Sequence, residues 1–180
     1  MRLSQFVTKT SKEASQSDVS RNAQLLTRAG FVNKLMAGVY SYLPLGLRTL
    51  NKIEKIVREE MDALGAQEVL LPALQPREIW DQTGRWDTVD VLFRFKGAGD
   101  RDLALGPTHE EVVTPLVNSF VQSYRDLPRA VYQIQTKFRN EARAKSGLLR
   151  GREFRMKDMY SFHAVPEDLD AFYERSITAY

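Results

Sequence analysis

The sequence predicts an α+β fold, in which helices flank an antiparallel sheet. Segments where apolar and polar residues alternate are separated by segments where apolar residues recur at every third or fourth position. These are the periods of strands and of amphipathic helices. Turn-rich links join neighbouring strand segments directly, which is typical of hairpins. Because hairpins build an antiparallel sheet, we expect helices on one face and a second face open to a ligand. With 180 residues, 43% of them hydrophobic, the chain can bury a core as one domain.

The N-terminal segment is expected to lie outside that core. Residues 1–18 are polar, with clusters of Ser and Lys, and are interpreted as an arm that orders on contact. Either Asp18 or Ser20 could cap a helix, because both side chains accept hydrogen bonds from a first helical turn. This helix is predicted to run to Ala29 and to be stopped by Gly30.

An aromatic segment and a long amphipathic helix follow. Residues 31–43 are expected to form a helical turn and a short hairpin or strand. The helix is predicted over 45–64, where Gly65 terminates it. Its apolar face consists of Leu47, Leu50, Ile53, Val57, Met61 and Leu64. A short strand is predicted over 67–72, with Pro72 at a strand end or sheet edge.

The middle of the chain is predicted to hold a short helix and a hairpin. The helix covers 76–84 and buries Trp80. The hairpin strands cover 92–96 and 102–105, on either side of a glycine-rich turn.

A capping box is predicted where the next helix begins. Thr108 and Glu111 are three residues apart, the spacing at which each side chain can bond the other's backbone N–H. This helix is expected over 109–124, with Pro115 as an irregularity inside it. A last helix is predicted over 166–180.

Two antiparallel strands joined by a long cationic loop are predicted between Tyr132 and His163. Alternation separates Ile134, Thr136 and Phe138 from Gln135, Lys137 and Arg139 on the first strand. It separates Phe154, Met156 and Asp158 from Arg155, Lys157 and Met159 on the second. The loop over 142–151 is longer than a hairpin needs, which is typical of a functional or mobile loop.

The polar face of this hairpin is a candidate site for a phosphorylated aromatic ligand. Its side chains are Arg139, Glu141, Arg150 and Phe154. Guanidinium groups bind phosphate, an aromatic ring stacks on a base, and a carboxylate accepts from an exocyclic amine.

Composition excludes several classes of site. The chain has no cysteine and only two histidines, which excludes disulfides, thiolate metal sites and histidine-rich metal sites. A net charge of +3 permits an anionic ligand or RNA without requiring either. The first residues do not resemble a signal peptide, and no stretch approaches the ~20 apolar residues of a membrane span. We therefore expect a cytoplasmic or organelle-matrix protein with no membrane partner.

Two stretches resemble the class II aminoacyl-tRNA synthetases. Residues 47–72, a helix followed by Gly-Ala-Gln-Glu-Val and a terminal proline, look like the first motif of that class, which builds the dimer interface. Residues 132–163 look like the second motif, with Phe-Arg-Asn-Glu at 138–141, a variable loop, and Arg-Gly-Arg-Glu-Phe-Arg-Met-Lys-Asp at 150–158. The resemblance implies that residues 19–180 are the N-terminal part of a class II catalytic domain, whose sheet is incomplete at its C-terminal end.

Further motifs are similar to those of the bacterial type of prolyl-tRNA synthetase. They are Gly-Pro-Thr-His-Glu-Glu at 106–111, Tyr-Gln-Ile-Gln-Thr-Lys-Phe-Arg at 132–139 and Met-Lys-Asp-Met-Tyr-Ser-Phe-His at 156–163. Their order and spacing along nearly the whole chain make the resemblance specific. It implies a proline–tRNA ligase that activates proline with ATP and transfers it to tRNA(Pro), as a homodimer formed through the first motif.

The resemblance implies a role in ATP binding for each residue of the hairpin site. Arg139 would be catalytic and would bridge the α-phosphate of ATP and the carboxylate of proline. Glu141 would accept from the adenine amine, Phe154 would stack on adenine, and Arg150 would hold the γ-phosphate end. Mg²⁺ would accompany ATP, and no tightly bound metal held by the protein is implied. The proline carboxylate is already ionised at neutral pH, so fixed positive charge can catalyse its attack without a general base.

The resemblance also implies a proline site. Thr108 and Glu110 would bind the prolyl nitrogen, a cation that is costly to bury unless it is paired. Residues in or beside the pyrrolidine pocket would be Met156, Asp158, Tyr160 and His163. His109 is interpreted as structural or solvent-facing. Arg143 and Lys145 either form a solvated face or approach ATP and the acceptor end of the tRNA.

Parts of the family pattern are absent from the sequence. It has no glycine-rich third motif, no anticodon-binding domain and no editing domain, so we expect part of a longer enzyme, weakly active or inactive alone. Two alternatives remain open. One is a non-catalytic class II-like accessory or RNA-binding module. The other is an enzyme of the same subclass for threonine or serine, although a threonine pocket uses a metal and the chain is poor in metal ligands.

Overall fold

The computed structural model describes residues 2–13 and 20–180. Asp18 and part of the expected N-terminal arm therefore lie outside the described residues. The helices are α1 (Arg21–Arg28), α2 (Pro44–Ala63), α3 (Arg77–Gln82), α4 (Glu110–Phe120) and α5 (Pro166–Ala179). The strands are β1 (Val32–Met36), β2 (Val39–Tyr42), β3 (Gln67–Glu68), β4 (Leu74–Pro76), β5 (Phe93–Lys96), β6 (Asp102–Leu105), β7 (Arg129–Phe138) and β8 (Glu153–Phe162).

The α+β class is confirmed, but the described strands form three small sheets instead of one antiparallel sheet. Their strand orders are β1-β2, β3-β7-β8 and β4-β6-β5. The predicted strand over 67–72 is wrong beyond residue 68, and this two-residue strand pairs parallel with β7. A long crossover that contains α3 and α4 separates the two strands, which allows them to run in the same direction.

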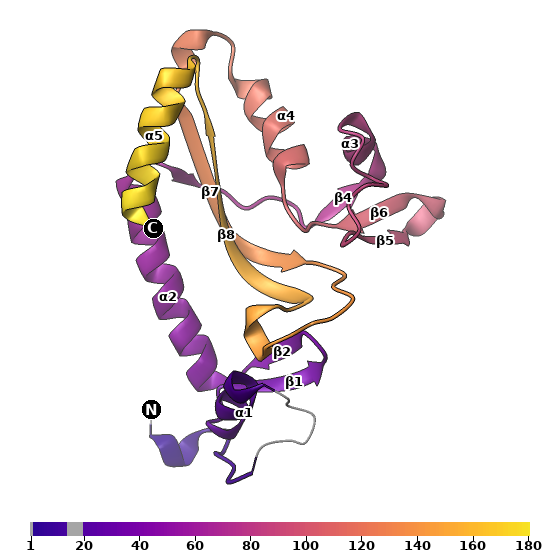
Figure 1. Ribbon diagram of the computed structural model, residues 1–180, viewed down its shortest axis with the longest axis vertical. Helices are drawn as coiled ribbons and strands as arrows, with labels where there is room; N and C mark the ends of the chain where they lie inside the picture. Colours follow the sequence, from indigo (N-terminus) through magenta and orange to yellow (C-terminus); the bar gives the residue numbers. More distant parts are fainter. Residues whose placement is uncertain (1, 14–19) are drawn as a thin grey trace.

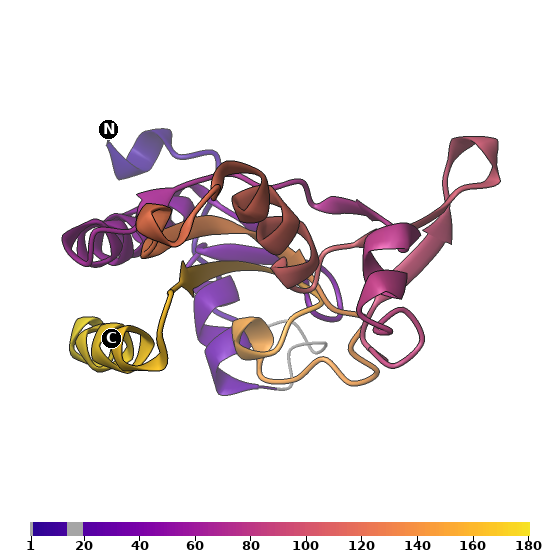
Figure 2. The same cartoon turned by 90° about the horizontal axis from the view of Figure 1, so that it is seen from above.

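The β7–β8 hairpin is the centre of the molecule. Its antiparallel register runs from Arg129 opposite Phe162 to Phe138 opposite Glu153, so the two strands predicted from alternation are confirmed. On one face, Tyr132 and Ile134 are buried against α2. Figures 1 and 2 show α2 and α5 on one side of the hairpin, and the β4-β6-β5 sheet with α3 on the opposite side. The helices thus leave the other face of the hairpin to the segments around α4.

The apolar stripe predicted for α2 divides into two parts. Met61 is buried in the core with Tyr132, and Val57 packs against them. By contrast, Leu47 is 47% exposed and Ile53 is 54% exposed. The described residues therefore cover the C-terminal part of the stripe and leave its N-terminal part in contact with water.

The predicted capping box of α4 is wrong. His109 occupies the N-cap position without a side-chain cap bond, while Thr108 donates to the side chain of Glu110. Glu111 instead binds Arg85, at 2.6 Å between Oε1 and Nη1. A buried ion pair has therefore replaced the local bond that the spacing suggested.

The C-terminal boundary of α4 also differs from the prediction. The helix ends at Phe120, not near 124. Ser123 and Asp126 form a capping box of their own, which starts a separate 3-10 turn over Tyr124–Asp126. This separately capped turn, which was not predicted from the sequence, follows shortly after α4 and explains why α4 ends early.

Two of the predicted helices, α1 and α3, agree with expectation. Ser20 is the N-cap of α1, although its side chain makes no cap bond there. Gly30 follows the helix with a φ of +70°, the left-handed region that favours glycine after a helix. Trp80 of α3 is fully buried in a second core with Trp86 and Leu92, as predicted for its helix.

Candidate functional site

The candidate site is the face of the β7–β8 hairpin that points away from α2 and α5. The strand register places Gln133 opposite Asp158 and Lys137 opposite Phe154 on this face. Gln133 and Lys137 are both fully buried. A sheet face lined by buried polar groups is unusual for a core and typical of a ligand site or its support.

The segment that leads into α4 lies beside this face. The backbone N–H of Phe138 donates to the carbonyl of Gly106 at 3.2 Å. A Cβ atom at Gly106 would lie 2.6 Å from Nε2 of Gln75 and 3.0 Å from Cε1 of His109. Glycine is therefore needed here because any larger side chain would collide with the buried side chains of Gln75 and His109.

The structure brings Arg139 and Phe154 together at one end of the face. The guanidinium carbon of Arg139 lies 5.4 Å from the centroid of the Phe154 ring. Its Nη2 lies 3.4 Å from the carbonyl oxygen of Pro107, which adjoins Thr108. A cation held by a ring and a carbonyl is well placed to meet an anionic group.

Glu141 and Arg150 bind each other. Nη2 of Arg150 lies 2.7 Å from Oε2 of Glu141. The carboxylate is largely covered, with 12% of its side chain exposed, whereas the Arg150 side chain is 59% exposed. Arg150 is therefore free to turn toward a ligand, and Glu141 would then gain a free acceptor oxygen.

The loop between the strands is held by the N-terminal hairpin and by α1. Arg152 donates to the carbonyls of Ala37 and Glu141, and its backbone N–H donates to Gly38 at 2.7 Å. Asn22 of α1 donates to the carbonyl of Ser146 at 2.7 Å. The N-terminal elements thus fix the loop that carries Glu141 and Arg150, while Arg143 and Lys145 on the same loop are exposed.

The segment that contains Thr108 and Glu110 presents an accessible carboxylate, that of Glu110, near the end of the face where Arg139 lies. The Glu110 side chain is 52% exposed, and its nearest basic partner, Arg85, is 3.9 Å away. Arg85 is closer to Glu111, whose side chain is fully buried. Because Arg85 is bound mainly to Glu111, the Glu110 carboxylate remains accessible to a cationic ligand.

Asp158, Tyr160 and Lys137 form a polar network beneath this segment. Oδ2 of Asp158 accepts from Nζ of Lys137 at 2.9 Å and from the Tyr160 hydroxyl at 2.6 Å. It also accepts from Gln133 at 3.0 Å. Lys137 further bonds to Nδ1 of His109. Oδ1 of Asp158 is buried and has no partner in the described part of the chain.

Of the two remaining predicted proline-site residues, one lies on this face and the other does not. Met156 shares the face, opposite Gln135 in the register. His163 follows the end of β8 and contacts α5, where Nδ1 lies 2.8 Å from Asp168 and the ring packs on Phe172. The structure therefore gathers Thr108, Glu110, Arg139, Phe154, Met156, Asp158 and Tyr160, but gives His163 different neighbours.

The sequence analysis missed the buried polar residues of this face. His109 is fully buried, so a solvent-facing position is wrong, and Lys137 and Gln75 were assigned no role. A signal was present, since Gln133, Gln135 and Lys137 alternate with apolar residues and so share a face with Arg139. What the sequence could not indicate is that the segment before α4 covers them.

The network shifts the protonation of its members. Burial lowers the pKa of His109, and the positive charge of Lys137 lowers it further, while Asp158 and Glu110 act in the opposite direction. Burial also lowers the pKa of Lys137, against the bond to Asp158. Burial and the bond to Asp158 raise the pKa of Tyr160. His109 is accordingly neutral at neutral pH.

The stability of the fold should therefore fall as His109 is forced to accept a proton. Its pKa is lowered in the folded state, so below about pH 6.5 the unfolded chain binds more protons at this position. The free energy of unfolding should decrease between pH 7 and pH 5.5, by at most about 1.4 kcal/mol per pH unit for this group. Urea denaturation across that range measures the slope, and His109→Gln should reduce it. An equal slope in the variant would contradict this role.

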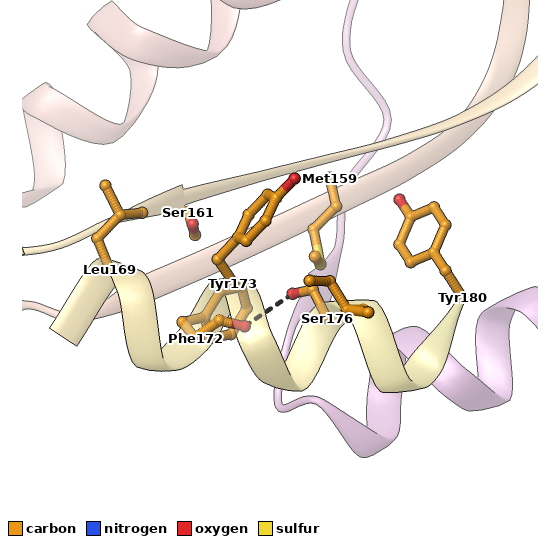
Figure 3. Close-up of a pocket in the computed structure, with 8 residues that line it drawn as sticks. Met159, Ser161, Leu169, Phe172, Tyr173, Ser176 and Tyr180 are labelled. Carbon is orange, nitrogen blue, oxygen red and sulfur yellow. Dashed lines mark hydrogen bonds between the residues drawn. The ribbon is translucent and has the colours of Figure 1, made fainter. Parts of the chain in front are cut away.

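A separate cavity lies on the opposite face of β8, against α5. It measures about 380 Å³ and is lined mainly by apolar and aromatic side chains, among them Met159, Phe172, Tyr173 and Ile177 (Figure 3). No Asp, Glu, Lys, Arg or His lines it. It therefore offers none of the charged groups that the hairpin face gathers, and the hairpin face is the better candidate for chemistry.

Neither a metal cluster nor a membrane-spanning helix occurs among residues 2–13 and 20–180. In these ranges no three His, Cys, Asp or Glu side chains come together as a metal site. None of the helices in them has both the length and the apolar character needed to cross a bilayer.

The sequence matches known proteins along its whole length. Residues 93–180 match the family described as the tRNA synthetase class II core domain (G, H, P, S and T). A proline–tRNA ligase of Shouchella clausii is 52% identical over 181 residues, covering 100% of this chain and 32% of the relative. One from Listeria welshimeri is 55% identical over 172 residues, covering 95% of this chain and 30% of the relative.

Solved structures share the fold. A Giardia lamblia prolyl-tRNA synthetase in complex with prolyl-adenylate superposes with a TM-score of 0.79 at 24% identity, over 86% of this chain and 33% of that one. A Cryptosporidium parvum prolyl-tRNA synthetase with L-proline and AMP gives a TM-score of 0.76 at 17% identity, over 87% and 31% of the two chains. The chain spans about a third of the length of the curated relatives it matches. Over nearly all of its residues, the chain is therefore 52–55% identical to a part of these proline–tRNA ligases.

Proposed function

We propose that the protein with this chain is a proline–tRNA ligase, which activates proline with ATP and transfers the prolyl group to tRNA(Pro). One observation carries the proposal: Arg139 lies 3.4 Å from the carbonyl of Pro107, at the start of the segment that presents Glu110. The guanidinium of Arg139, which suits a phosphate, thus lies close to the segment that carries the carboxylate of Glu110, which suits an ammonium group. The names of the relatives support proline as the amino acid.

In the proposed first step, an oxygen of the proline carboxylate attacks the α-phosphorus of ATP. The bond from that phosphorus to the oxygen bridging to the β-phosphate breaks, and pyrophosphate leaves with the electron pair. Two anions must meet in this step, and Arg139 would stabilise the charge that builds on the phosphoryl oxygens. Phe154, whose ring already contacts Arg139, would stack on adenine.

The remaining ATP contacts would require the Glu141–Arg150 pair to open. Glu141 would then accept from the adenine amine, and Arg150 would hold the γ-phosphate end. The high exposure of the Arg150 side chain, 59%, supports such a movement. Mg²⁺ would enter with the triphosphate, because the described residues gather no set of side chains to hold a metal ion. We assign no step to the ion.

The proposed amino-acid site is built around the exposed carboxylate of Glu110, whose contact with Arg85 is long at 3.9 Å. Thr108 and Glu110 would bind the secondary ammonium of proline, with Met156, Asp158 and Tyr160 beside the pyrrolidine ring. His163 would not line the pocket and would support it only indirectly, through its contacts with α5. In the second step, the terminal ribose hydroxyl of the tRNA would attack the prolyl carbonyl and release AMP, with Arg143 and Lys145 near its acceptor end.

We also propose a homodimer formed through α2. The exposed fractions of Leu47 and Ile53 are 47% and 54%, which leaves the N-terminal part of the apolar face of α2 uncovered, while its C-terminal part packs on the core. Ile53→Glu should weaken dimerisation at least about tenfold, because a carboxylate would be buried without a partner. Sedimentation velocity on the protein at its natural length measures this. A monomeric wild type at micromolar concentration would contradict the proposal.

Three further assignments remain proposals. Residues 1–18 would be an arm and residues 19–180 the N-terminal part of the catalytic domain, which limited proteolysis can test by its first cleavage sites. The protein would act in the cytoplasm or an organelle matrix, where cell fractionation should find it.

The proposed function is tested by ATP–pyrophosphate exchange with the protein expressed at its natural length. Exchange should depend on proline and should exceed that with serine, threonine or alanine. Transfer of labelled proline to tRNA(Pro) should follow. Absence of amino-acid-dependent exchange would favour a non-catalytic module, and faster exchange with another amino acid would replace proline as the substrate.

A further inference from the structure

Lys137 is a fully buried amine in the middle of the candidate site, and the proposed reaction gives it no task. None of its surface is exposed, and it lies on the site face of β7, opposite Phe154. A buried ammonium is costly unless it is paired and hydrogen-bonded. Its partners are Asp158, at 2.9 Å from Nζ to Oδ2, and Nδ1 of His109.

The bonds of His109 show which way the hydrogen bond from Lys137 runs. Nε2 of His109 lies 3.0 Å from the carbonyl oxygen of Pro72. A carbonyl can only accept, so Nε2 carries the hydrogen and Nδ1 of the neutral ring is an acceptor. Lys137 therefore donates to Nδ1, and the imidazole is fixed at both of its nitrogens.

The network and a second buried side chain, Gln75, hold the backbone at His109 and at Thr108. The N–H of His109 donates to the Tyr160 hydroxyl at 3.1 Å, and that hydroxyl donates to Oδ2 of Asp158. Nε2 of Gln75 donates to the carbonyl of Thr108 at 3.1 Å. Thr108, His109 and Glu110 are consecutive, so the position of the Thr108–Glu110 acceptors depends on this buried scaffold.

Charge balance gives Lys137 a second task. Its positive charge compensates the Asp158 carboxylate, which is 12% exposed and lies four residues along β8 from Phe154 on the same face. Glu111 is compensated by Arg85. Glu110 is left as the carboxylate of this segment that an ammonium ligand can reach, with 52% of its side chain exposed.

We propose that Lys137 is a positioning residue for the amino acid: it fixes His109 and neutralises Asp158, so that Thr108 and Glu110 alone present acceptors to the substrate's ammonium group. This inference rests on the proposed function, since it assigns a role within that site. Without Lys137, Nδ1 of His109 loses its donor and Asp158 loses its counter-charge. The Thr108–Glu110 segment then loses its fixed position, whereas the Arg139–Phe154 end keeps its own contacts.

The test measures exchange kinetics of the natural-length protein with Lys137→Met, which keeps the length of the side chain and removes its charge. The KM for proline should rise about 10- to 100-fold, with the KM for ATP unchanged and kcat within about threefold, because binding of one substrate is weakened. A merely structural role would lower the active fraction and hence kcat, and would leave both KM values as they are. Lys157→Met is the matched control, because Lys157 lies on the next strand with its amine over the Tyr180 ring, on the opposite face. It should change neither KM.

Each outcome decides the inference. A Lys137→Met enzyme with a wild-type KM for proline, or with both KM values raised equally, overturns it and leaves the proposed function intact. A wild-type protein without proline-dependent exchange overturns the proposed function and the inference with it. If Lys137→Met does not fold, His109→Gln replaces it. Glutamine can keep the bond to Pro72 but not the acceptor at Nδ1, so the KM for proline should again rise alone. An unchanged KM in that variant also overturns the inference.

Discussion

Replacing Arg139 with alanine is expected to lower the rate of proline-dependent ATP–pyrophosphate exchange by about 10²- to 10³-fold, the loss typical of removing one preorganised charge donor. Arg139 follows the last residue of β7 and is held between the Phe154 ring, at 5.4 Å, and the carbonyl of Pro107, at 3.4 Å. Its position is therefore set before the ligand arrives. No other basic side chain in the described part of the chain makes both contacts.

The matched control for this variant is Arg129→Ala. Arg129 begins the same strand, pairs with Phe162 at the far end of the hairpin, and is exposed. Its removal is expected to leave the exchange rate within about twofold, as for a surface substitution. A folded Arg139→Ala protein that exchanges at a nearly normal rate would remove Arg139 from the catalytic role.

Replacing Glu110 with glutamine is expected to raise the KM for proline by about 10- to 100-fold. The change keeps the shape of the side chain and removes the negative charge, and a hydrogen bond to a charged group contributes about 1.5–3 kcal/mol. The KM for ATP should not change, because the proposed partner of Glu110 is the ammonium group of proline and not ATP. Steady-state exchange at saturating ATP and varied proline measures the effect.

Glu111→Gln separates binding from stability at the neighbouring position. Glu111 undergoes the same chemical change, but its carboxylate is buried and bound to Arg85 at 2.6 Å. This variant should lose about 1–3 kcal/mol of folding free energy, since the fully buried side chain at position 111 loses its charge-assisted hydrogen bond to Arg85. It should keep the wild-type KM for proline. If Glu110→Gln and Glu111→Gln gave the same proline KM, Glu110 would have no special role in binding.

The hairpin and the main helices could be predicted from sequence because their signals are local. Strict alternation defined β7 and β8 to within a few residues, and recurring apolar residues with a terminal glycine defined α2. The candidate residues Arg139 and Phe154 were also identified on the correct face. In each case one short segment contains the information, in the form of a period or a turn residue.

The features that sequence could not predict depend on contacts between distant segments. The capping box at Thr108 failed because Arg85, far along the chain, binds Glu111. β3 runs parallel to β7 because of the crossover between them. The network of Lys137, His109 and Asp158 exists only because the segment before α4 folds over the strand, which no local pattern encodes.

The most direct test of the central claim is a calorimetric titration of the natural-length protein with a non-hydrolysable prolyl-adenylate analogue. The proposed site predicts one binding event per chain, weakened by both Arg139→Ala and Glu110→Gln, and much weaker binding of the seryl analogue. The account is contradicted if the prolyl analogue does not bind, or if neither substitution affects its affinity.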